Sequence, residues 1–406
     1  MSPRTREKRF GLSEVLAAAE NAEPVASVDV VAGSLCERFG ARAVSFLLVD
    51  LIGQGLVRLT HEVQCGGDAE RVALRDSDYE TVLRTQRPRR LPADDGGQRV
   101  ITPVTNRGDA IGVLELTLPD AGEEVLRQVI EAAHALAYII VTDRRFTDLY
   151  EWGQRTTPMS LAAEIQHRLL PSAACCEAAE FTLACALVPV DDIGGDTYDY
   201  TLDRDAVHLS VTDAMGHEVD SAILATLLVN ALRRARRAGC GLAEQAQQAH
   251  QALLDHGRSG FATGQLLRIG LDGGRARIVN AGHPWPMRLR DGVPQEVPLA
   301  VDLPFGLFSP TAYTVQDLDL RPGDRLLLYT DGMRERSGGM DLAAILLDSR
   351  DLHPREAVRV LTGALMDACH GDPADDATVL CLDWYGARPA SRRTTGGADP
   401  AAASSP

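Results

Sequence analysis

The feature that most constrains the fold is a pair of short strand-like segments joined by a tight turn. The first covers about 195–202 and the second about 206–212, with Asp203-Arg204-Asp205 between them. Apolar and polar residues alternate in the second segment, which indicates a strand with one buried face. Acidic residues are common in turns because their side chains bond to the nearby backbone. The stretch therefore predicts an antiparallel hairpin.

Aspartates lie at the open end of this predicted hairpin. If the turn centres on Arg204, antiparallel pairing places Asp196 opposite Thr212 and beside Asp213. Two carboxylates this close repel each other unless a positive group lies between them. The hairpin therefore predicts a divalent metal site.

Two later segments repeat this arrangement. The apolar strand 326–330 ends at Asp331, and Asp375-Asp376 directly precede the strand 378–382. In an antiparallel sheet the end of one strand lies beside the start of its neighbour, so all these aspartates can share one edge. Carboxylates without cysteine or histidine partners favour Mg²⁺ or Mn²⁺ over Zn²⁺. Two such ions can activate a water between them and polarise a phosphoryl group.

Composition narrows the classes of partner. The 406 residues include 41 basic and 57 acidic side chains, a formal charge of −16. An acidic chain without a basic stripe argues against nucleic acid and anionic membranes as partners. Eight scattered cysteines favour reduced thiols. No secretory signal begins the sequence, and its longest apolar runs are too short to span a bilayer, so we expect a cytoplasmic protein.

The N-terminal half predicts an α+β domain of helices flanking an antiparallel sheet. The expected elements are a helix at 28–39, strands at 43–49 and 56–60, a hairpin within 103–116, and a long helix at 123–149. Residues 22–149 resemble a GAF domain in the order of these elements and in the segment ITPVTNRGDAIGVLEL followed by a closing helix. A PAS-like domain is the alternative. The resemblance implies a sensor domain, and no residue identifies its ligand.

A short helix is expected between the two halves of the chain. Thr157 and Pro158 suit its start, and Pro171 ends it. We interpret it as a signalling helix at a dimer seam, with a plain linker as the alternative. The expected divisions are an N-terminal arm (1–21), the GAF-like domain (22–149), a helical linker (150–172), the C-terminal domain (173–387) and a disordered tail (388–406).

Six motifs in the C-terminal half resemble the PPM class of metal-dependent serine/threonine phosphatases, in its SpoIIE- and RsbU-like branch. They are IGGDTYDY (193–200), TDAMGHEVDSA (212–222), NAGHPWP (280–286), LPFGL (303–307), LLLYTDGMRE (326–335) and ADDATVLCL (374–382). The resemblance covers about 169–384 and implies an antiparallel β-sandwich flanked by helices. A sensor domain joined to such a phosphatase is also common in that branch.

The resemblance implies roles for the aspartates. Asp213 bridges two Mn²⁺ or Mg²⁺ ions, and Asp196 together with the backbone carbonyl of Ala214 lies on the side of one of them. Asp331 and Asp375 hold the other ion, with Asp376 as the neighbouring alternative to Asp375. A water bridging the metals attacks phosphorus, with no covalent phosphoenzyme, so Asp213 and Asp196 are the expected catalytic residues.

One position departs from the family pattern. Glu218 stands where the family often has glycine, which removes no ligand but can disturb the entry to the following helix. His217 and His283 are candidate acid–base groups. The preferred interpretation is that each histidine orders its loop through hydrogen bonds.

The resemblance implies a phosphoserine/phosphothreonine protein phosphatase regulated by its GAF-like domain. The implied substrate is a phosphorylated anti-sigma-factor antagonist in partner-switching signalling. One alternative is a catalytically inactive module that uses the same fold to bind a partner. Another is a metal-dependent hydrolase of a different phosphoester, such as a nucleotide.

Overall fold

The chain folds into two compact units, each described here by itself. The computed structural model describes residues 12–59, 70–94, 96–155, 159–190, 194–216, 218–257, 260–273, 275–308, 310–334, 340–387, 394–399 and 402–404. One unit comprises 1–157 together with 393–406, and the other comprises 158–392.

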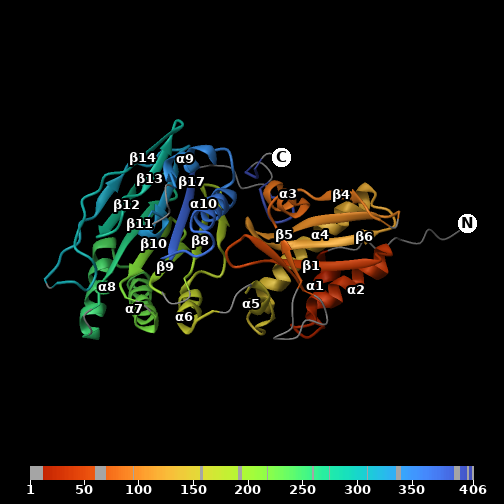
Figure 1. The fold of residues 1–406 in the computed structure, drawn as a ribbon, viewed down its shortest axis with the longest axis horizontal. Helices are drawn as coiled ribbons and strands as arrows, with labels where there is room; N and C mark the ends of the chain where they lie inside the picture. The colour runs from red at the N-terminus through yellow and green to blue at the C-terminus, as the bar shows by residue number, and fades with distance from the viewer. Residues whose placement is uncertain are drawn as a thin grey trace, which may run out of the picture. The chain divides into compact units, whose positions relative to one another are not determined.

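The first unit is an antiparallel sheet covered by helices on both faces (Figure 1). Its sheet has the strand order β3-β2-β1-β6-β5-β4. Its elements are α1 (Leu12–Glu20), α2 (Ser27–Phe39), β1 (Ala43–Val49), β2 (Gly55–Leu59), β3 (Arg71–Ala73), α3 (Asp78–Thr85), β4 (Arg89–Pro92), β5 (Gln98–Asn106), β6 (Asp109–Leu118), α4 (Glu123–Asp143) and α5 (Leu149–Gln154).

Each face of this sheet buries its own apolar cluster. Leu136 and Ile140 of α4 pack with Leu35 of α2 over one face, and Val82 of α3 packs with Leu47 over the other. The alternation of apolar residues along the strands supplies both faces. The α+β arrangement of the N-terminal half therefore follows the expectation, and its assignment as a GAF-like sensor stays a prediction.

The prediction of one long helix over 123–149 is wrong about where that helix ends. Helix α4 ends at Asp143, and a separate helix, α5, begins at Leu149. The intervening run is mostly charged and polar, so it offers no apolar face to bury. The Thr147 hydroxyl accepts the Leu149 backbone N–H at 3.1 Å and marks the new start. Within the described residues α4 alone is long and apolar enough to cross a bilayer, and half of its apolar window is buried.

Part of the tail differs from the expected disorder. Thr395 and Ala398 form an isolated β-bridge, and the Gly108 backbone N–H donates to the Gly397 carbonyl at 3.0 Å. A Cβ on Gly397 would lie 1.8 Å from the carbonyl oxygen of Thr105, so only glycine permits this approach. Residues 394–399 therefore form part of the first unit, while 388–393 lie outside the described residues.

The second unit is a β-sandwich of a five-stranded and a six-stranded antiparallel sheet, ordered β15-β12-β11-β10-β9 and β14-β13-β16-β17-β8-β7 (Figure 1). Its elements are α6 (Leu161–Leu169), β7 (Cys175–Glu177), β8 (Phe181–Val188), β9 (Asp196–Leu202), β10 (Ala206–Ala214), α7 (Glu218–Arg237), α8 (Leu242–His256), β11 (Ala262–Gly270), β12 (Ala276–Ala281), β13 (Met287–Arg290), β14 (Val293–Glu296), β15 (Gln316–Leu318), β16 (Arg325–Tyr329), the 3₁₀ turn η1 (Asp331–Met333), α9 (Leu342–Asp348), α10 (Pro354–Ala368) and β17 (Ala377–Trp384).

Three apolar layers hold this unit together. Leu209 of β10 and Leu380 of β17 belong to the layer between the sheets. Leu228 of α7 packs in a second layer over the five-stranded sheet, and Leu361 of α10 packs in a third over the six-stranded sheet. The order helix, sheet, sheet, helix confirms the expected helix-flanked antiparallel sandwich.

Helix α6 begins later than the sequence suggests. Its N-cap is Ser160, whose hydroxyl accepts the Ala163 backbone N–H at 3.2 Å, whereas Thr157 and Pro158 lie outside the described residues. The predicted linker is therefore divided, because α5 belongs to the first unit and α6 packs against α7 in the second.

Candidate metal centre

The β9–β10 hairpin brings two carboxylates into direct register. Asp196 pairs with Asp213, and Thr197 pairs with Thr212. The expected pairing of Asp196 with Thr212 is wrong by one residue, because the Asp203 backbone N–H donates to the Ala206 carbonyl and closes a turn with an even number of residues. The correction places the two carboxylates closer together than the sequence indicated.

Asp196 is a buried carboxylate that accepts a hydrogen bond from a threonine hydroxyl. It is 2% exposed, and the Thr330 hydroxyl donates to its Oδ2 at 2.6 Å. Burial raises the pKa of Asp196 well above its usual range, and the carboxylates of Asp213 and Asp376 raise it further. A cation bound here would remove this repulsion, so the electrostatics of the site favour a metal.

The six-stranded sheet brings Asp331 to the same edge through Thr330. Besides donating to Asp196, the Thr330 hydroxyl accepts the Thr378 backbone N–H at 2.9 Å. Directly after Asp331, a Cβ on Gly332 would lie 2.0 Å from the Asp376 carbonyl oxygen. Glycine therefore allows the turn after β16 to lie against the start of β17, where Asp375 and Asp376 precede the strand.

The two adjacent aspartates differ in their surroundings. Asp376 is buried, and its carboxylate accepts the Val190 backbone N–H at 2.7 Å and the Gln166 amide at 2.6 Å. Burial raises the pKa of Asp376 to about 6, although these hydrogen bonds oppose the shift. Asp375 is half-buried, and its Oδ1 accepts the Asp376 backbone N–H at 2.8 Å. This difference favours Asp375 as the ligand and Asp376 as a structural support.

Helix α6 contributes a residue that the sequence reasoning missed. Gln166 is fully buried, and its Nε2 donates both to the Asp196 carbonyl at 2.8 Å and to Asp376. One amide thus joins β9 of one sheet to the start of β17 in the other. Its signal in the sequence is a polar residue within the apolar stripe formed by Ala162 and Leu169.

The backbone carbonyl of Ala214, the fifth predicted ligand, lies against Gly195. A Cβ on Gly195 would lie 2.2 Å from this oxygen, so the glycine permits the close approach. The predicted set therefore consists of oxygen donors: four carboxylates and one carbonyl. Such a set fits hard ions such as Mg²⁺ or Mn²⁺.

The side chains do not converge fully. Within the part of the chain that the structure describes, no three His, Cys, Asp or Glu side chains form a group close enough to hold a metal ion. The structure brings Asp196 and Asp213 together, and joins Asp196 to Thr330 beside Asp331. We expect the half-buried carboxylates to rotate toward a bound ion, because its charge would offset their mutual repulsion.

The structure shows the surroundings of His283 and the backbone conformation of Glu218. His283 is buried, with its Nδ1 2.8 Å from the Thr263 hydroxyl, and Asn280 bonds to both its backbone N–H and its carbonyl. This supports an ordering role, and His217 lies outside the described residues. Glu218 has a φ of 59°, in the left-handed region, which explains why glycine suits this position.

We expect His283 to make the protein less stable in acid. Burial lowers the pKa of His283 to about 3, whereas an unfolded histidine titrates near 6.5. Between these values the unfolded chain binds the additional proton, so stability falls with decreasing pH by about 1.4 kcal/mol per pH unit. Urea unfolding at pH 6, 5 and 4 should show a smaller pH dependence in His283→Gln than in the wild type. A matched substitution at exposed His370 should keep the wild-type slope.

We expect Thr330→Val to lower the free energy of unfolding by about 1–3 kcal/mol, because it leaves buried Asp196 and the Thr378 backbone N–H without their shared partner. Thr330→Ser keeps the hydroxyl and should recover most of the loss. Chemical denaturation of both variants checks this. Equal stability of the valine variant and the wild type would contradict the described network.

Comparisons with known proteins point to one family. Residues 203–385 match the family described as Stage II sporulation protein E (SpoIIE). Phosphoserine phosphatase RsbP of Bacillus subtilis (strain 168) is 28% identical over 166 residues, covering 39% of this chain and 41% of that protein. The chain thus matches about two fifths of this relative's length. The resemblance of the C-terminal half to SpoIIE-like PPM phosphatases is confirmed over the matched residues.

Two solved structures are similar to this chain. The RsbU and RsbW domains of Rv1364c from Mycobacterium tuberculosis are 25% identical, with a TM-score of 0.46, covering 53% of this chain and 63% of that chain. The PP2C phosphatase domain of SpoIIE from Bacillus subtilis, with a fragment of its regulatory domain, is 13% identical, with a TM-score of 0.45, covering 92% and 94%.

Proposed function

We propose that this chain, whose residues 203–385 match the SpoIIE family, is a metal-dependent phosphoserine/phosphothreonine protein phosphatase. The observation that carries the proposal is the register of Asp196 with Asp213 beside the Thr330–Asp331 segment. These acidic groups come from distant parts of the sequence, and we propose that they line one edge of the sandwich. A structural role alone does not account for a buried carboxylate held next to like charges.

Two divalent ions would be held by Asp196, Asp213, Asp331, Asp375 and the Ala214 carbonyl, with Asp213 contributing to both. When bound, two divalent ions supply an activated water and neutralise charge on the phosphoryl oxygens. The protein's contribution is to fix the oxygen ligands in place. The Thr330 hydroxyl orients the Asp196 carboxylate, and the β9–β10 pairing holds Asp213 beside it.

We further propose that the substrate is a phosphorylated protein of the anti-sigma-factor antagonist class. The relative in Bacillus subtilis is described as a phosphoserine phosphatase, which supports a phosphoserine substrate. Control by the GAF-like unit and a homodimer formed through the linker helices are part of the same proposal. Sedimentation of the full chain tests the homodimer, and a monomer at all concentrations excludes it.

An assay of the full chain tests the proposed activity. Para-nitrophenyl phosphate is supplied with Mn²⁺, Mg²⁺ or EDTA, followed by a phosphoserine peptide and a nucleoside triphosphate at equal concentration. We expect turnover that needs divalent metal and favours the phosphopeptide. The absence of metal-dependent turnover would instead support a catalytically inactive binding module, and preference for the nucleotide would support a hydrolase of another phosphoester.

A further inference from the structure

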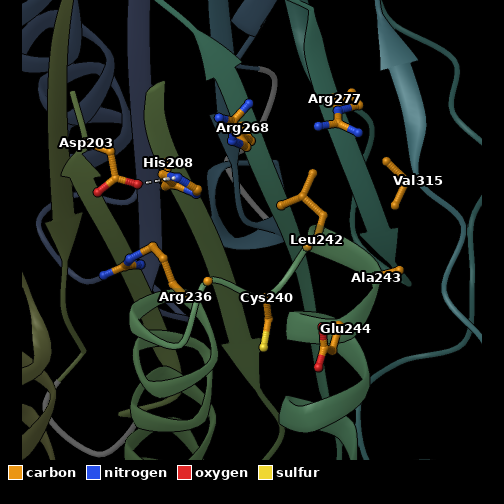
Figure 2. Close-up of a pocket in the computed structure, with 12 residues that line it drawn as sticks. Asp203, His208, Arg236, Cys240, Leu242, Ala243, Glu244, Arg268, Arg277 and Val315 are labelled. Atoms are coloured by element: carbon orange, nitrogen blue, oxygen red, sulfur yellow. Dashed lines mark hydrogen bonds and ion pairs between the residues drawn. The ribbon is translucent and has the colours of Figure 1, made fainter. Parts of the chain in front are cut away.

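A pocket of about 490 Å³ lies on the outer face of the five-stranded sheet, where the connection between α7 and α8 crosses it (Figure 2). His208 lines this pocket from β10, whereas Asp213 lies near the other end of the same strand. Five residues of strand separate them by about 17 Å. The pocket is therefore distinct from the acidic edge.

A row of basic side chains forms the floor of this pocket. His208 of β10 pairs across the sheet with Arg268 of β11, which in turn pairs with Arg277 of β12. Residues in cross-strand register project from the same face, so all three reach the pocket (Figure 2). The sequence does not show this row, because two helices and one hairpin turn separate the three residues along the chain.

Three of the charged side chains that line the pocket are arginines. Arg236, Arg268 and Arg277 line it together with the carboxylates of Asp203 and Glu244. Arg236 bonds to Asp199 at 3.0 Å, and Arg268 bonds to the exposed Asp205 at 3.2 Å.

Arg277 differs from the other two arginines. It is exposed, and it makes no hydrogen bond or ion pair within the described part of the chain, where Asp317 pairs instead with Arg275 at 3.9 Å. A cation is therefore available at the pocket wall.

His208 has an unfilled hydrogen-bonding position. The residue is 8% exposed, its Nε2 lies 3.0 Å from the Asp203 carboxylate, and its Nδ1 is buried without a partner. Burial lowers the pKa of His208, Arg236 and Arg268 lower it further, and Asp203 opposes them. An anion beside the ring offsets the two arginines, so it favours proton uptake and allows Nδ1 to donate.

The N-terminus of α8 completes the wall of the pocket. Its N-cap, Gly241, supplies no side-chain cap to the first turn, and Leu242, Ala243 and Glu244 of that turn line the pocket. Backbone N–H groups at a helix start have no intrahelical acceptor and favour negative charge. The buried, unpartnered Nδ1 of His208 is a second and separate indication that a ligand binds here, and the helix start favours an anionic one.

We propose that this pocket binds a small phosphorylated molecule, independently of the metal centre. The phosphate lies between Arg277, Arg268 and His208 beside the start of α8, because arginine and helix N–H groups both suit its oxygens. The pocket is larger than one phosphate, and Leu242 and Val315 offer apolar surface to an organic group. Its volume is that of a small-ligand site.

Titration of the full chain tests the proposal. Inorganic phosphate, adenosine monophosphate and adenosine are added with EDTA present, because phosphate at the acidic edge depends on bound metal. We expect the monophosphate to bind more tightly than phosphate, and adenosine not to bind. Arg277→Gln should weaken binding roughly tenfold through one lost charged hydrogen bond. Arg350→Gln, the same change on an exposed side chain outside the pocket, should bind as the wild type does.

Sulfate gives a second readout, because its charge does not change near neutral pH. Calorimetry in buffers of different ionisation enthalpy should show proton uptake on sulfate binding, and His208→Gln should abolish it. Equal affinities of the wild type and Arg277→Gln, or no binding of any phosphate compound, would overturn the site. Tighter binding of a phosphoserine peptide than of the monophosphate would overturn the small-molecule assignment.

Discussion

Asp213→Asn is expected to lower Mn²⁺-dependent phosphatase activity by roughly 10³-fold or more, with the fold retained. Asp213 lies directly opposite Asp196 in the β9–β10 pairing and is the proposed ligand shared by both ions. Asparagine has nearly the same shape but lacks the negative charge that holds them. Metal ions contribute several kcal/mol to such reactions, and each 1.4 kcal/mol corresponds to tenfold in rate.

A matched control separates this effect from a general loss of charge. Asp291→Asn removes one carboxylate from an exposed hairpin turn, where a φ of 51° is also tolerated by asparagine. This control should keep wild-type activity and Mn²⁺ requirement. Circular dichroism and thermal unfolding should show that both variants fold. Substantial activity in a folded Asp213→Asn variant would remove Asp213 from the proposed mechanism.

Gln166→Leu is expected to raise the Mn²⁺ concentration needed for half-maximal activity roughly tenfold. The substitution keeps the volume of the buried side chain but removes the donor to both the Asp196 carbonyl and the Asp376 carboxylate. Leaving two buried acceptors without this donor also lowers the free energy of unfolding, by about 1–3 kcal/mol for each of them. The two sheets then lose one of the side chains that join them at the acidic edge, while the Thr330–Asp196 hydrogen bond remains.

Two further variants make this prediction specific. Gln166→Glu adds a carboxylate beside Asp376 and should be more damaging than leucine, because like charges repel in a buried site. Glu164→Gln alters the same helix at a side chain that pairs with Arg168, and it should leave the Mn²⁺ requirement unchanged. An unaltered Mn²⁺ requirement in Gln166→Leu would show that α6 does not support the site.

Local sequence patterns predicted most of the strands. Alternation along 206–212 predicted β10, and the hairpin predicted that Asp196 and Asp213 lie close together on neighbouring strands. The shared edge of four carboxylates stays a prediction. The register was wrong by one residue because it depends on the bonding of the Asp203–Ala206 turn. Residue types alone do not determine that bonding.

Long-range contacts account for what the sequence did not predict. Gln166 acts on Asp376, 210 residues later, and no local pattern links the two. Thr330 had a weak signal, since a threonine precedes the aspartate at the end of both β10 and β16, but its bond to Asp196 requires both sheets. The composition around Gly396-Gly397 predicts a disordered tail. The contact between Gly397 and Thr105 that orders this turn is visible only in the folded structure.

The most direct test of the central claim is the number of Mn²⁺ ions that the full chain binds. Titration calorimetry of the metal-free wild type should give two ions per chain, since the oxygen donors at the acidic edge are proposed to hold a pair. Asp213→Asn should lose this binding, because both ions share that carboxylate. Less than one ion bound by the wild type, or an unchanged number in Asp213→Asn, would contradict the claim.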